Sequence, residues 1–262
     1  MLYLIFILSS GILFLQTINI FSMSGHSKWA TTKRAKAVVD AKRGAVFTKI
    51  SNIITIAARK GGDPTMNFAL AQAVEQARAV NMPKDNIERA IKRGTGESGG
   101  QAIEELVYEG HGPAQSQFVV RVLTDNRNRA ASNIRHLFSK QGGSLGAVLW
   151  NFEQKGVILI AEETWQTSNL SWDDFELEAI DAGVDDIRHE TDGIIIYTKP
   201  EDLVKVKKWL ETKKLTTDSA EIEYVAKEKK TVSESDREKI ENFIEALESD
   251  EDVSAYFTNV EM

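Results

Sequence analysis

Residues 156–160, GVILI, and residues 193–198, GIIIYT, are two short apolar runs that decide the fold class of this 262-residue chain. Both have the length and the β-branched content of buried strands. Helical patterns begin at Ser171, which can cap a helix, and at Pro200, which can open one. Two further strand patterns cover residues 186–189 and 220–226. The resulting order, β-α-β-β-α-β, predicts a ferredoxin-like unit and an α+β protein.

A second set of α/β patterns lies ahead of this stretch. Residues 105–110 and 117–123 predict strands, and Asp125 or Asn126 would cap the helix that follows. A third strand is expected near residues 147–152. This set therefore supplies three strands but only one helix.

The end of the chain can complete that second set. Ser233 is expected to cap an amphipathic helix, and residues 252–259 predict a strand. Without them, one face of the three-stranded sheet would stay bare. We therefore expect residues 98–153 and 232–262 to form one ferredoxin-like domain, with residues 154–231 inserted into it as another.

The front of the chain is helical. Residues 44–60 and 67–80 place apolar side chains at three- and four-residue steps, as in amphipathic helices. Residues 81–83, NMP, interrupt the pattern, because proline lacks a donor and disfavours helix in the residue before it. A third helix is expected from Asp85, as its N-cap, to Gly94. We predict that residues 23–97 form a basic helical domain.

Charge is distributed unevenly along the chain. Residues 23–100 hold 14 Lys and Arg against 6 Asp and Glu, whereas the remainder holds 18 against 33. A basic front indicates contact with a polyanion. Arg89, Lys92 and Arg93, at i, i+3 and i+4, would form a stripe on one outward face that fits a phosphate backbone. Two helices joined by a short turn also resemble a helix-turn-helix, and the alternative is a plain hairpin whose basic side is solvated.

Residues 1–22 carry no charge and are mostly apolar, and the segment is long enough to cross a bilayer. Met23 stands directly before a charged, periodic sequence, so we interpret residues 1–22 as an extension from a misplaced start. A membrane anchor or targeting segment is the alternative. The chain has no cysteine, which excludes a disulfide framework and favours a reducing, cytoplasmic location.

Motifs for catalysis are missing. The four histidines are far apart in sequence, and none has metal-ligand spacing with another. Residues 94–99, GTGESG, match GxGxxG, but they follow an expected helix and precede none, unlike a dinucleotide fingerprint. We predict no catalytic residue, no metal, no cofactor and no small-molecule substrate.

Five segments from Met23 onward carry a family resemblance. They read MSGHSKWATTKRAKAVVDAKRGAVFTKI, IAARKGGDP, NMPKDNIERAIKRGTG, YEGHGP and LTDNRNR. In this order they resemble the YebC/PmpR family, which also includes the mitochondrial translational activator of cytochrome c oxidase subunit one. The resemblance implies a helical first domain and two α/β domains, the third inserted in the second. It also implies a DNA-binding transcriptional regulator, although some members are ribosome-associated factors that help translate proline-rich stretches.

The chain departs from the family pattern in two loops. Family members usually show a glycine pair where this chain has Ala114-Gln115-Ser116, and their loop at residues 142–148 is longer. Any role for these two loops is therefore left open, and binding residues are carried over only within the basic first domain.

We predict a non-enzymatic, nucleic-acid-binding regulator of gene expression, of the DNA-binding transcriptional type. The alternative is a ribosome-associated translation factor that binds ribosomal RNA and assists the synthesis of proline-rich stretches. A membrane-tethered protein would follow if residues 1–22 are genuine. The residues expected to bind nucleic acid are Lys28, Trp29, Lys33, Arg34, Lys36, Lys42, Arg43, Lys49, Lys84, Asn86, Arg89, Lys92 and Arg93, and the expected functional loop is Asn81, Met82 and Pro83.

Overall fold

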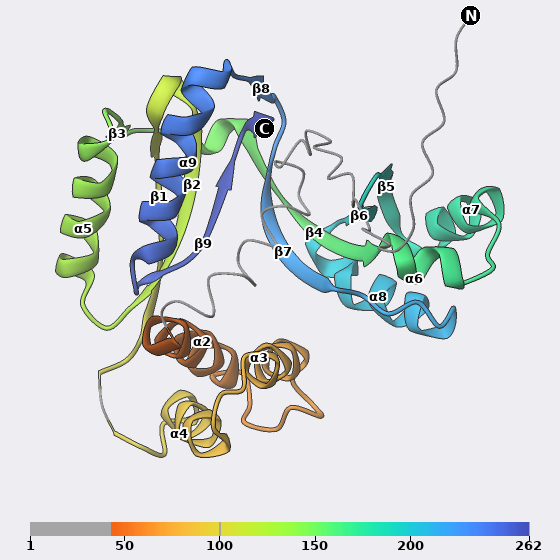
Figure 1. The fold of residues 1–262 in the computed structure, drawn as a ribbon. Helices are drawn as coiled ribbons and strands as arrows, with labels where there is room; N and C mark the ends of the chain where they lie inside the picture. Colours follow the sequence, from red (N-terminus) through yellow and green to blue (C-terminus); the bar gives the residue numbers. More distant parts are fainter. Residues whose placement is uncertain (1–42, 100, 262) are drawn as a thin grey trace, which may run out of the picture.

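The computed structural model of the chain describes residues 43–99 and 101–261, apart from the side chain of Arg43 (Figure 1). The predicted extension at residues 1–22 lies outside the described residues, as do Lys28, Trp29, Lys33, Arg34, Lys36 and Lys42. Within the described part, no helix is both long and apolar enough to cross a membrane.

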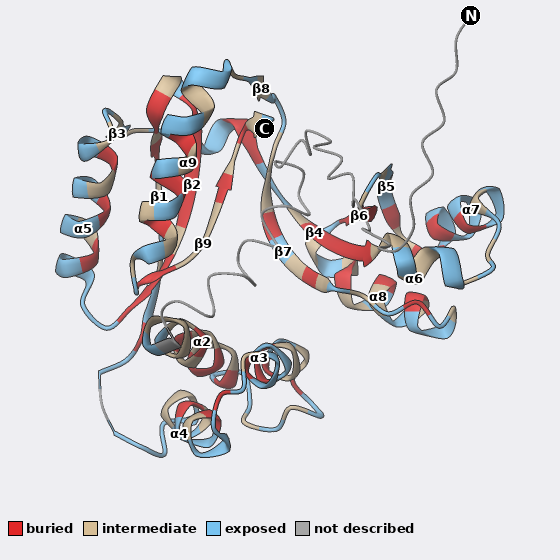
Figure 2. Ribbon diagram, in the orientation of Figure 1, coloured by how far each residue is buried: buried red, intermediate tan, exposed pale blue. Residues whose placement is uncertain are grey.

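Three helices form what we call the helical unit, residues 43–99. They are α2 (Arg43–Ala58), α3 (Phe68–Ala79) and α4 (Lys84–Thr95). α3 and α4 each pack against α2, as Figure 1 shows, and the apolar side of each helix is buried between them (Figure 2). The three predicted helices are therefore confirmed, but α3 and α4 do not pair mainly with each other as in a helix-turn-helix.

The predicted ends of α4 were wrong. Pro83, not Asp85, occupies the N-cap, and its carbonyl accepts from the Asn86 N–H at 2.9 Å. Proline is tolerated at the start of a helix because the N–H groups there have no helical acceptor, so the missing N–H of proline costs no helical hydrogen bond. At the other end the helix continues through Gly94, and Gly96 is the C-cap with φ 84°, in the left-handed region.

Four strands form the first sheet, in the order β3-β1-β2-β9 with every pair antiparallel. They are β1 (Glu104–His111), β2 (Gln117–Thr124), β3 (Ser144–Leu145) and β9 (Val253–Thr258). Two helices, α5 (Arg127–Lys140) and α9 (Glu234–Ser249), cover one face. Phe118 of β2, Phe138 of α5 and Phe243 of α9 meet in the core, with Phe243 4.9 Å from each of the other two rings. We call residues 101–151 and 230–261 the first sheet unit.

The sequence placed α9 and β9 with this sheet, but for a wrong reason. α9 lies beside α5 on the same face, so it does not cover a face that α5 leaves bare. The opposite face carries Val119 and Phe257, which pack with Val148 and Phe152. The chain order of this unit, β-β-α-β followed by α-β, is also not the ferredoxin-like order predicted for it.

The strand predicted near residues 147–152 is absent from the structure. Ala147 and Val148 are irregular, η3 (Leu149–Asn151) is a 3-10 turn, and a strand starts only at Phe152. The reason is a tertiary contact: the Glu109 carboxylate accepts from the N–H groups of Val148 and Leu149, at 2.6 and 2.7 Å. These donors are then unavailable for a strand ladder.

The second sheet unit, residues 152–229, follows the predicted β-α-β-β-α-β order. Its strands are β4 (Phe152–Ala161), β5 (Val184–Glu190), β6 (Gly193–Thr198) and β7 (Ser219–Ala226), in the antiparallel order β5-β6-β4-β7. Its helices are α6 (Glu162–Thr167), α7 (Trp172–Ala182) and α8 (Leu203–Thr212), the last preceded by the turn η4 (Pro200–Asp202). Ile158 and Ile194 lie in the core under α7 and α8.

The remaining short elements belong to the first sheet unit. They are η2 (Pro113–Gln115), β8 (Lys230–Thr231) and β10 (Val260–Glu261), and β8 pairs with β10 in parallel. Over residues 43–99 and 101–261 the protein is thus mixed α/β, with two antiparallel four-stranded sheets. The predicted domain boundaries at residues 97/98, 153/154 and 231/232 stay a prediction.

Candidate nucleic-acid interface

A close backbone contact holds α4 against α2. A Cβ placed at Gly94 would lie 2.4 Å from the Thr55 carbonyl oxygen and 2.6 Å from the Ala58 Cβ, so a larger residue would push the helices apart. With its apolar side fixed on α2, the helix turns Arg89 and Lys92 to the exposed side. The packing of the helical unit therefore decides which cations face solvent.

The predicted functional loop, Asn81-Met82-Pro83, ends α3 and begins α4. Asn81 has φ 57°, a left-handed conformation that asparagine tolerates. Its N–H donates to the Arg78 carbonyl at 3.0 Å, and the Met82 N–H donates to the Ala77 carbonyl at 2.9 Å, as in a Schellman motif. Met82 is buried in the core of the helical unit, so its side chain reaches no partner unless that core opens. A binding role for this loop stays a prediction.

The outward face of α4 presents two cations. Arg89 is exposed and donates through Nε to the Asp85 carbonyl at 3.3 Å and through Nη2 to the side-chain oxygen of Asn86. Lys92 is exposed and forms no ion pair with any residue in 43–99 or 101–261. Both groups can approach a phosphate without losing a strong partner. Asn86, in contrast, already accepts from Arg89, which limits it as a reader of bases.

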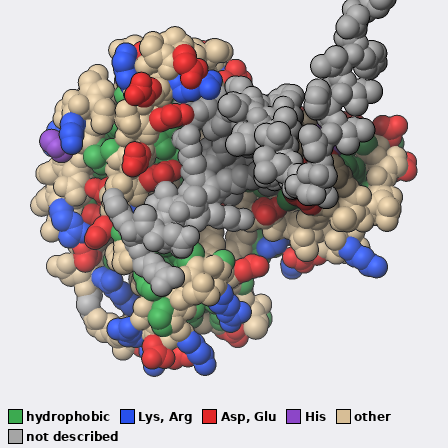
Figure 3. Space-filling view, viewed as in Figure 1, with side chains coloured by type: hydrophobic (Ala, Val, Ile, Leu, Met, Phe, Trp, Pro, Cys, Tyr) green, Lys and Arg blue, Asp and Glu red, His purple; other side chains and the backbone are tan. Residues whose placement is uncertain are grey.

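The other cations of the helical unit differ in availability. Lys84 is exposed but lies 3.5 Å from the Glu88 carboxylate. Lys60 and Arg78 are exposed and form no ion pair among the described residues. In Figure 3, Lys and Arg side chains gather over the helical unit at the bottom of the view, with acidic side chains among them. The sequence prediction missed Lys60 and Arg78, although the IAARKGGDP segment contains the first.

Two predicted nucleic-acid ligands instead reach toward the first sheet unit. Lys49 Nζ donates to the Glu248 carbonyl at 2.6 Å. Arg93 donates to the Gln101 carbonyl at 3.0 Å and lies 4.0 Å from the Asp125 carboxylate. Arg93 is thus separated from the outward face that it was predicted to share with Arg89 and Lys92.

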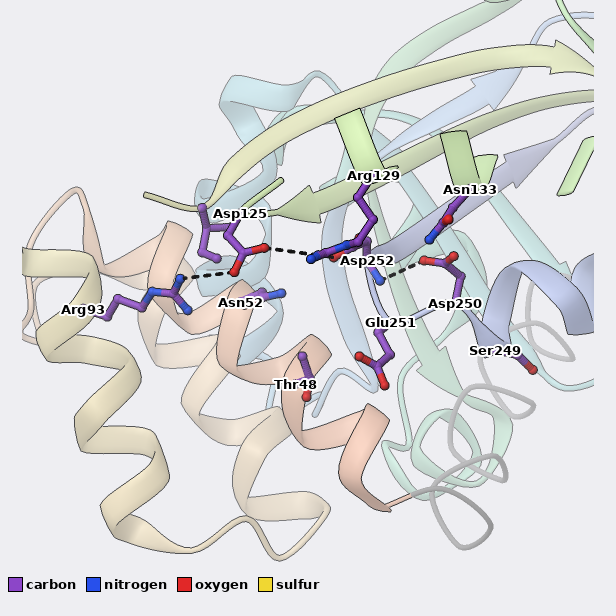
Figure 4. Close-up of a pocket in the computed structure, with 11 residues that line it drawn as sticks. Thr48, Asn52, Arg93, Asp125, Arg129, Asn133, Ser249, Asp250, Glu251 and Asp252 are labelled. Carbon is purple, nitrogen blue, oxygen red and sulfur yellow. Dashed lines mark hydrogen bonds and ion pairs between the residues drawn. The ribbon is translucent and has the colours of Figure 1, made fainter. Parts of the chain in front are cut away.

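A polar cavity of about 590 Å³ lies where Arg93 meets the first sheet unit (Figure 4). Arg129 crosses one side of it, 3.0 Å from the Asp252 carboxylate and 3.1 Å from Asp125. The hydrogen bonds that Arg129 donates to Asp252, together with the charges of Asp252 and Asp125, raise the pKa of the Arg129 guanidinium above its ordinary value. The sequence prediction did not find this cavity, although Asp125 and Arg129 lie within its LTDNRNR segment.

The histidine and acidic side chains elsewhere in the described part of the chain form pairs with no metal-ligand cluster. Among residues 43–99 and 101–261, no three His, Asp and Glu side chains gather as metal ligands. The GxGxxG match spans the end of α4 and the segment leading to β1, so it opens no helix, in line with its rejection as a dinucleotide motif. His189 Nε2 lies 2.7 Å from Glu162 and its ring stacks on Trp172, and this hydrogen bond lowers the pKa of Glu162.

Fold and site together define a mixed α/β protein in which a helical unit with an exposed, partly basic helix is joined to two antiparallel sheets. The chain also matches two family models. Residues 27–97 match the TACO1/YebC protein N-terminal domain, and residues 103–260 match the TACO1/YebC second and third domain. The chain therefore belongs to the TACO1/YebC family.

Relatives and a solved structure agree with this assignment. A probable transcriptional regulatory protein from Kosmotoga olearia is 46% identical over 244 residues, covering 92% of this chain and 95% of the relative. Another, from Thermoanaerobacter pseudethanolicus, is 43% identical over 244 residues, which cover 92% of this chain and 98% of the relative. The crystal structure of a conserved hypothetical protein from Aquifex aeolicus superposes with a TM-score of 0.74 at 38% identity, covering 86% of this chain and 92% of that one.

Proposed function

We propose that the chain is a non-enzymatic regulator of gene expression that binds nucleic acid through its helical unit, with duplex DNA as the principal partner. The observation that carries the proposal is the outward face of α4, where Arg89 and Lys92 are exposed without a carboxylate partner among the described residues. Relatives named as transcriptional regulatory proteins support the regulatory part.

The chemistry of this face favours phosphate contacts. Arg and Lys bind the charged backbone, whereas sequence is read by donors and acceptors aimed at base edges. At the start of α4, Lys84 pairs with Glu88 and Asn86 is engaged by Arg89, so few groups remain for bases. We expect binding that depends on salt and shape more than on sequence.

The packing of the helical unit favours a second candidate, a ribosome-associated translation factor that binds ribosomal RNA. Because α3 and α4 both pack on α2, the unit lacks the paired helices that seat a recognition helix in a DNA groove. Phosphate-binding cations serve an RNA backbone equally well. The same experiment therefore compares both polymers.

The test is a salt titration of binding with the full chain and the double variant Arg89→Ala/Lys92→Ala. With duplex DNA, we expect the slope of log affinity against log salt to become shallower by about 1.8, since each lost phosphate contact removes about 0.9. Lys205→Ala/Lys208→Ala is the matched control, because it removes two exposed cations from α8. An unchanged slope for the α4 variant, or an equal change in the control, would contradict the proposal. Tighter binding to ribosomes than to DNA at physiological salt would favour the translation factor.

A further inference from the structure

Trp150 is an exposed aromatic side chain on a firmly held turn. Its exposed fraction is 62%, although a side chain of this size is usually largely buried. It lies in η3, directly before β4, which starts beside β8 and the C-terminus in Figure 1, at the end of the first sheet unit opposite the helical unit. Leu149 beside it is 36% exposed. An indole that is exposed on such a turn is a candidate ligand-binding group.

The backbone around Trp150 is held on both sides. Glu109 accepts from the N–H groups of Val148 and Leu149, as described above. The Asn151 N–H donates to the Val148 carbonyl at 3.0 Å, and its side chain is buried. The ring is therefore presented by a turn that loses little conformational entropy on binding, which is a feature of sites that are organised before the ligand arrives.

A cation contacts the backbone of the same residue. Lys227 is exposed, and its Nζ donates to the Trp150 carbonyl oxygen at 3.2 Å, which keeps the ammonium group beside the turn. Lys227 forms no ion pair among the described residues. An aromatic platform with an adjacent cation is the arrangement that binds a stacked base and its phosphate in single-stranded nucleic acid.

We propose that Trp150 and Lys227 form a second nucleic-acid site, which takes one unstacked base of a single strand on the indole and its phosphate on the ammonium group. A stable protein interface needs about 800 Å² on each side. One ring with a partly exposed leucine offers far less, so a base fits the exposed surface better than a protein partner does. The proposal rests on the proposed function, to which it adds a ligand class and a place distant from α4.

The experiment measures fluorescence anisotropy of labelled 20-nucleotide oligo-uridylate and oligo-deoxythymidylate, with a 20-base-pair duplex beside them. For Trp150→Ala we expect affinity for the single strands to fall about tenfold, because one stacked base contributes about that much. Trp150→Phe retains a ring and should lose less. Duplex affinity should not change, and neither should the salt slope, because no charge is removed.

Lys227→Ala should instead make the single-strand salt slope shallower by about 0.7. Leu177→Ala on α7 is the matched control, because it removes an exposed apolar side chain, 67% exposed, far from the turn. Lys227 bonds the backbone carbonyl of Trp150 and not its ring, so Trp150→Ala keeps this hydrogen bond. We therefore expect Trp150→Ala to keep the melting temperature of the parent.

Two results would overturn the proposal. One is single-strand affinity that is absent in the parent or unchanged in Trp150→Ala. The other is a loss of self-association in Trp150→Ala by sedimentation velocity, which would make the ring a protein contact. An unchanged duplex affinity in the α4 variant Arg89→Ala/Lys92→Ala would instead contradict the proposed function. Failure of the Trp150 site and failure of the proposed function can therefore be told apart.

Discussion

The two junctions of the first sheet unit are built differently. The helical junction, its contact with the helical unit, uses long or polar side chains that reach across to backbone, such as Lys49 to Glu248 and Asn52 to Leu123 at 3.2 Å, and it surrounds a cavity of about 590 Å³. The sheet junction, its contact with the second sheet unit, is filled by buried amides and apolar side chains. We expect the helical junction to open at lower free energy.

Asn151 is the centre of the sheet junction. Its Nδ2 donates to Gln117 Oε1 at 2.7 Å and to the Glu228 carbonyl at 3.0 Å, and its Oδ1 accepts from the Glu228 N–H at 2.8 Å. Gln117 in turn donates its N–H to the Asn259 side chain at 2.9 Å. Because Asn151, Gln117 and Asn259 are buried, their side chains are shielded from water and depend on these hydrogen bonds.

The largest effect is expected for Asn151→Ala. Removal of the amide leaves the buried side-chain oxygen of Gln117 unsatisfied, at about 1–3 kcal/mol, and also removes two partly buried hydrogen bonds to the Glu228 backbone, so we expect a total loss of about 3 kcal/mol of unfolding free energy. Urea unfolding followed by circular dichroism measures it. Asn133→Ala is the control at the helical junction, where Asn133 is exposed beside the cavity, and it should change stability by less than about 0.5 kcal/mol. Equal losses of unfolding free energy in Asn151→Ala and Asn133→Ala would contradict the view that buried amides stabilise the sheet junction more than the helical junction.

A glycine pair tests the packing that supports the helical junction. Gly94→Ala inserts a Cβ against Thr55 and Ala58, and overpacking of this kind costs about 1–3 kcal/mol. Gly44→Ala in α2 is the matched control, since a Cβ there meets nothing within 4 Å. In an exposed helix alanine is better than glycine by about 0.5–1 kcal/mol, so Gly44→Ala should stabilise the chain. Thermal unfolding of both variants gives the sign, and a stabilised Gly94→Ala would refute the close contact.

A smaller and opposite effect is expected at η2, next to the sheet junction. Ala114 and Gln115 have φ 53° and 56°, a left-handed conformation that costs a side-chain-bearing residue about 1–2 kcal/mol. Lys230 Nζ holds the turn by donating to the Ala114 carbonyl at 2.6 Å. The family resemblance implies a glycine pair within the segment that Ala114, Gln115 and Ser116 occupy here, and glycine adopts a positive φ without this cost.

Ala114→Gly should therefore raise unfolding free energy by about 0.5–1 kcal/mol, since relief of the strained φ exceeds the entropy that glycine adds to the unfolded chain. Differential scanning calorimetry of the variant gives the shift. Ala147→Gly, at an exposed position without a positive φ, should lose stability. If both variants lose stability by the same amount, the turn is not strained.

Periodic elements could be predicted from the sequence, but contacts between them could not. The apolar spacing gave α2, α3 and α4, and the order of patterns gave the second sheet unit. The strand expected at residues 147–152 failed because Glu109, some 40 positions earlier, takes its N–H groups. No local pattern contains such a pairing.

The candidate site shows the same division. Arg89 and Lys92 could be placed on an outward helix face from spacing alone. Arg93 directly follows Lys92 in the predicted stripe, but it lies near Asp125, which is distant in sequence. The cavity was missed because Arg129 and Asp252 are separated by more than 100 residues and meet only once β9 pairs with β2. Charge counts locate a basic region, whereas tertiary contacts decide which of its charges remain available.

The smallest effect concerns the ion pairs of the helical junction. Asp125 accepts from Arg129 at 3.1 Å and lies 4.0 Å from Arg93, with 38% of its side chain exposed. Pairs this exposed contribute about 0.5 kcal/mol, and salt screens them. Asp125→Asn should therefore cost about 0.5 kcal/mol in 10 mM salt and close to nothing in 1 M salt, by urea unfolding in both buffers.

The salt comparison also separates the two junctions directly. The amide network around Asn151 carries no net charge, so the loss caused by Asn151→Ala should be the same in both salt concentrations. Asp125→Asn should also slightly increase the affinity for duplex DNA at low salt, because it removes a negative charge that lies beside the helical unit and repels the phosphates. An Asp125→Asn effect on stability that persists in 1 M salt would show that this carboxylate acts through packing or hydrogen bonding, and the helical junction would then resemble the sheet junction.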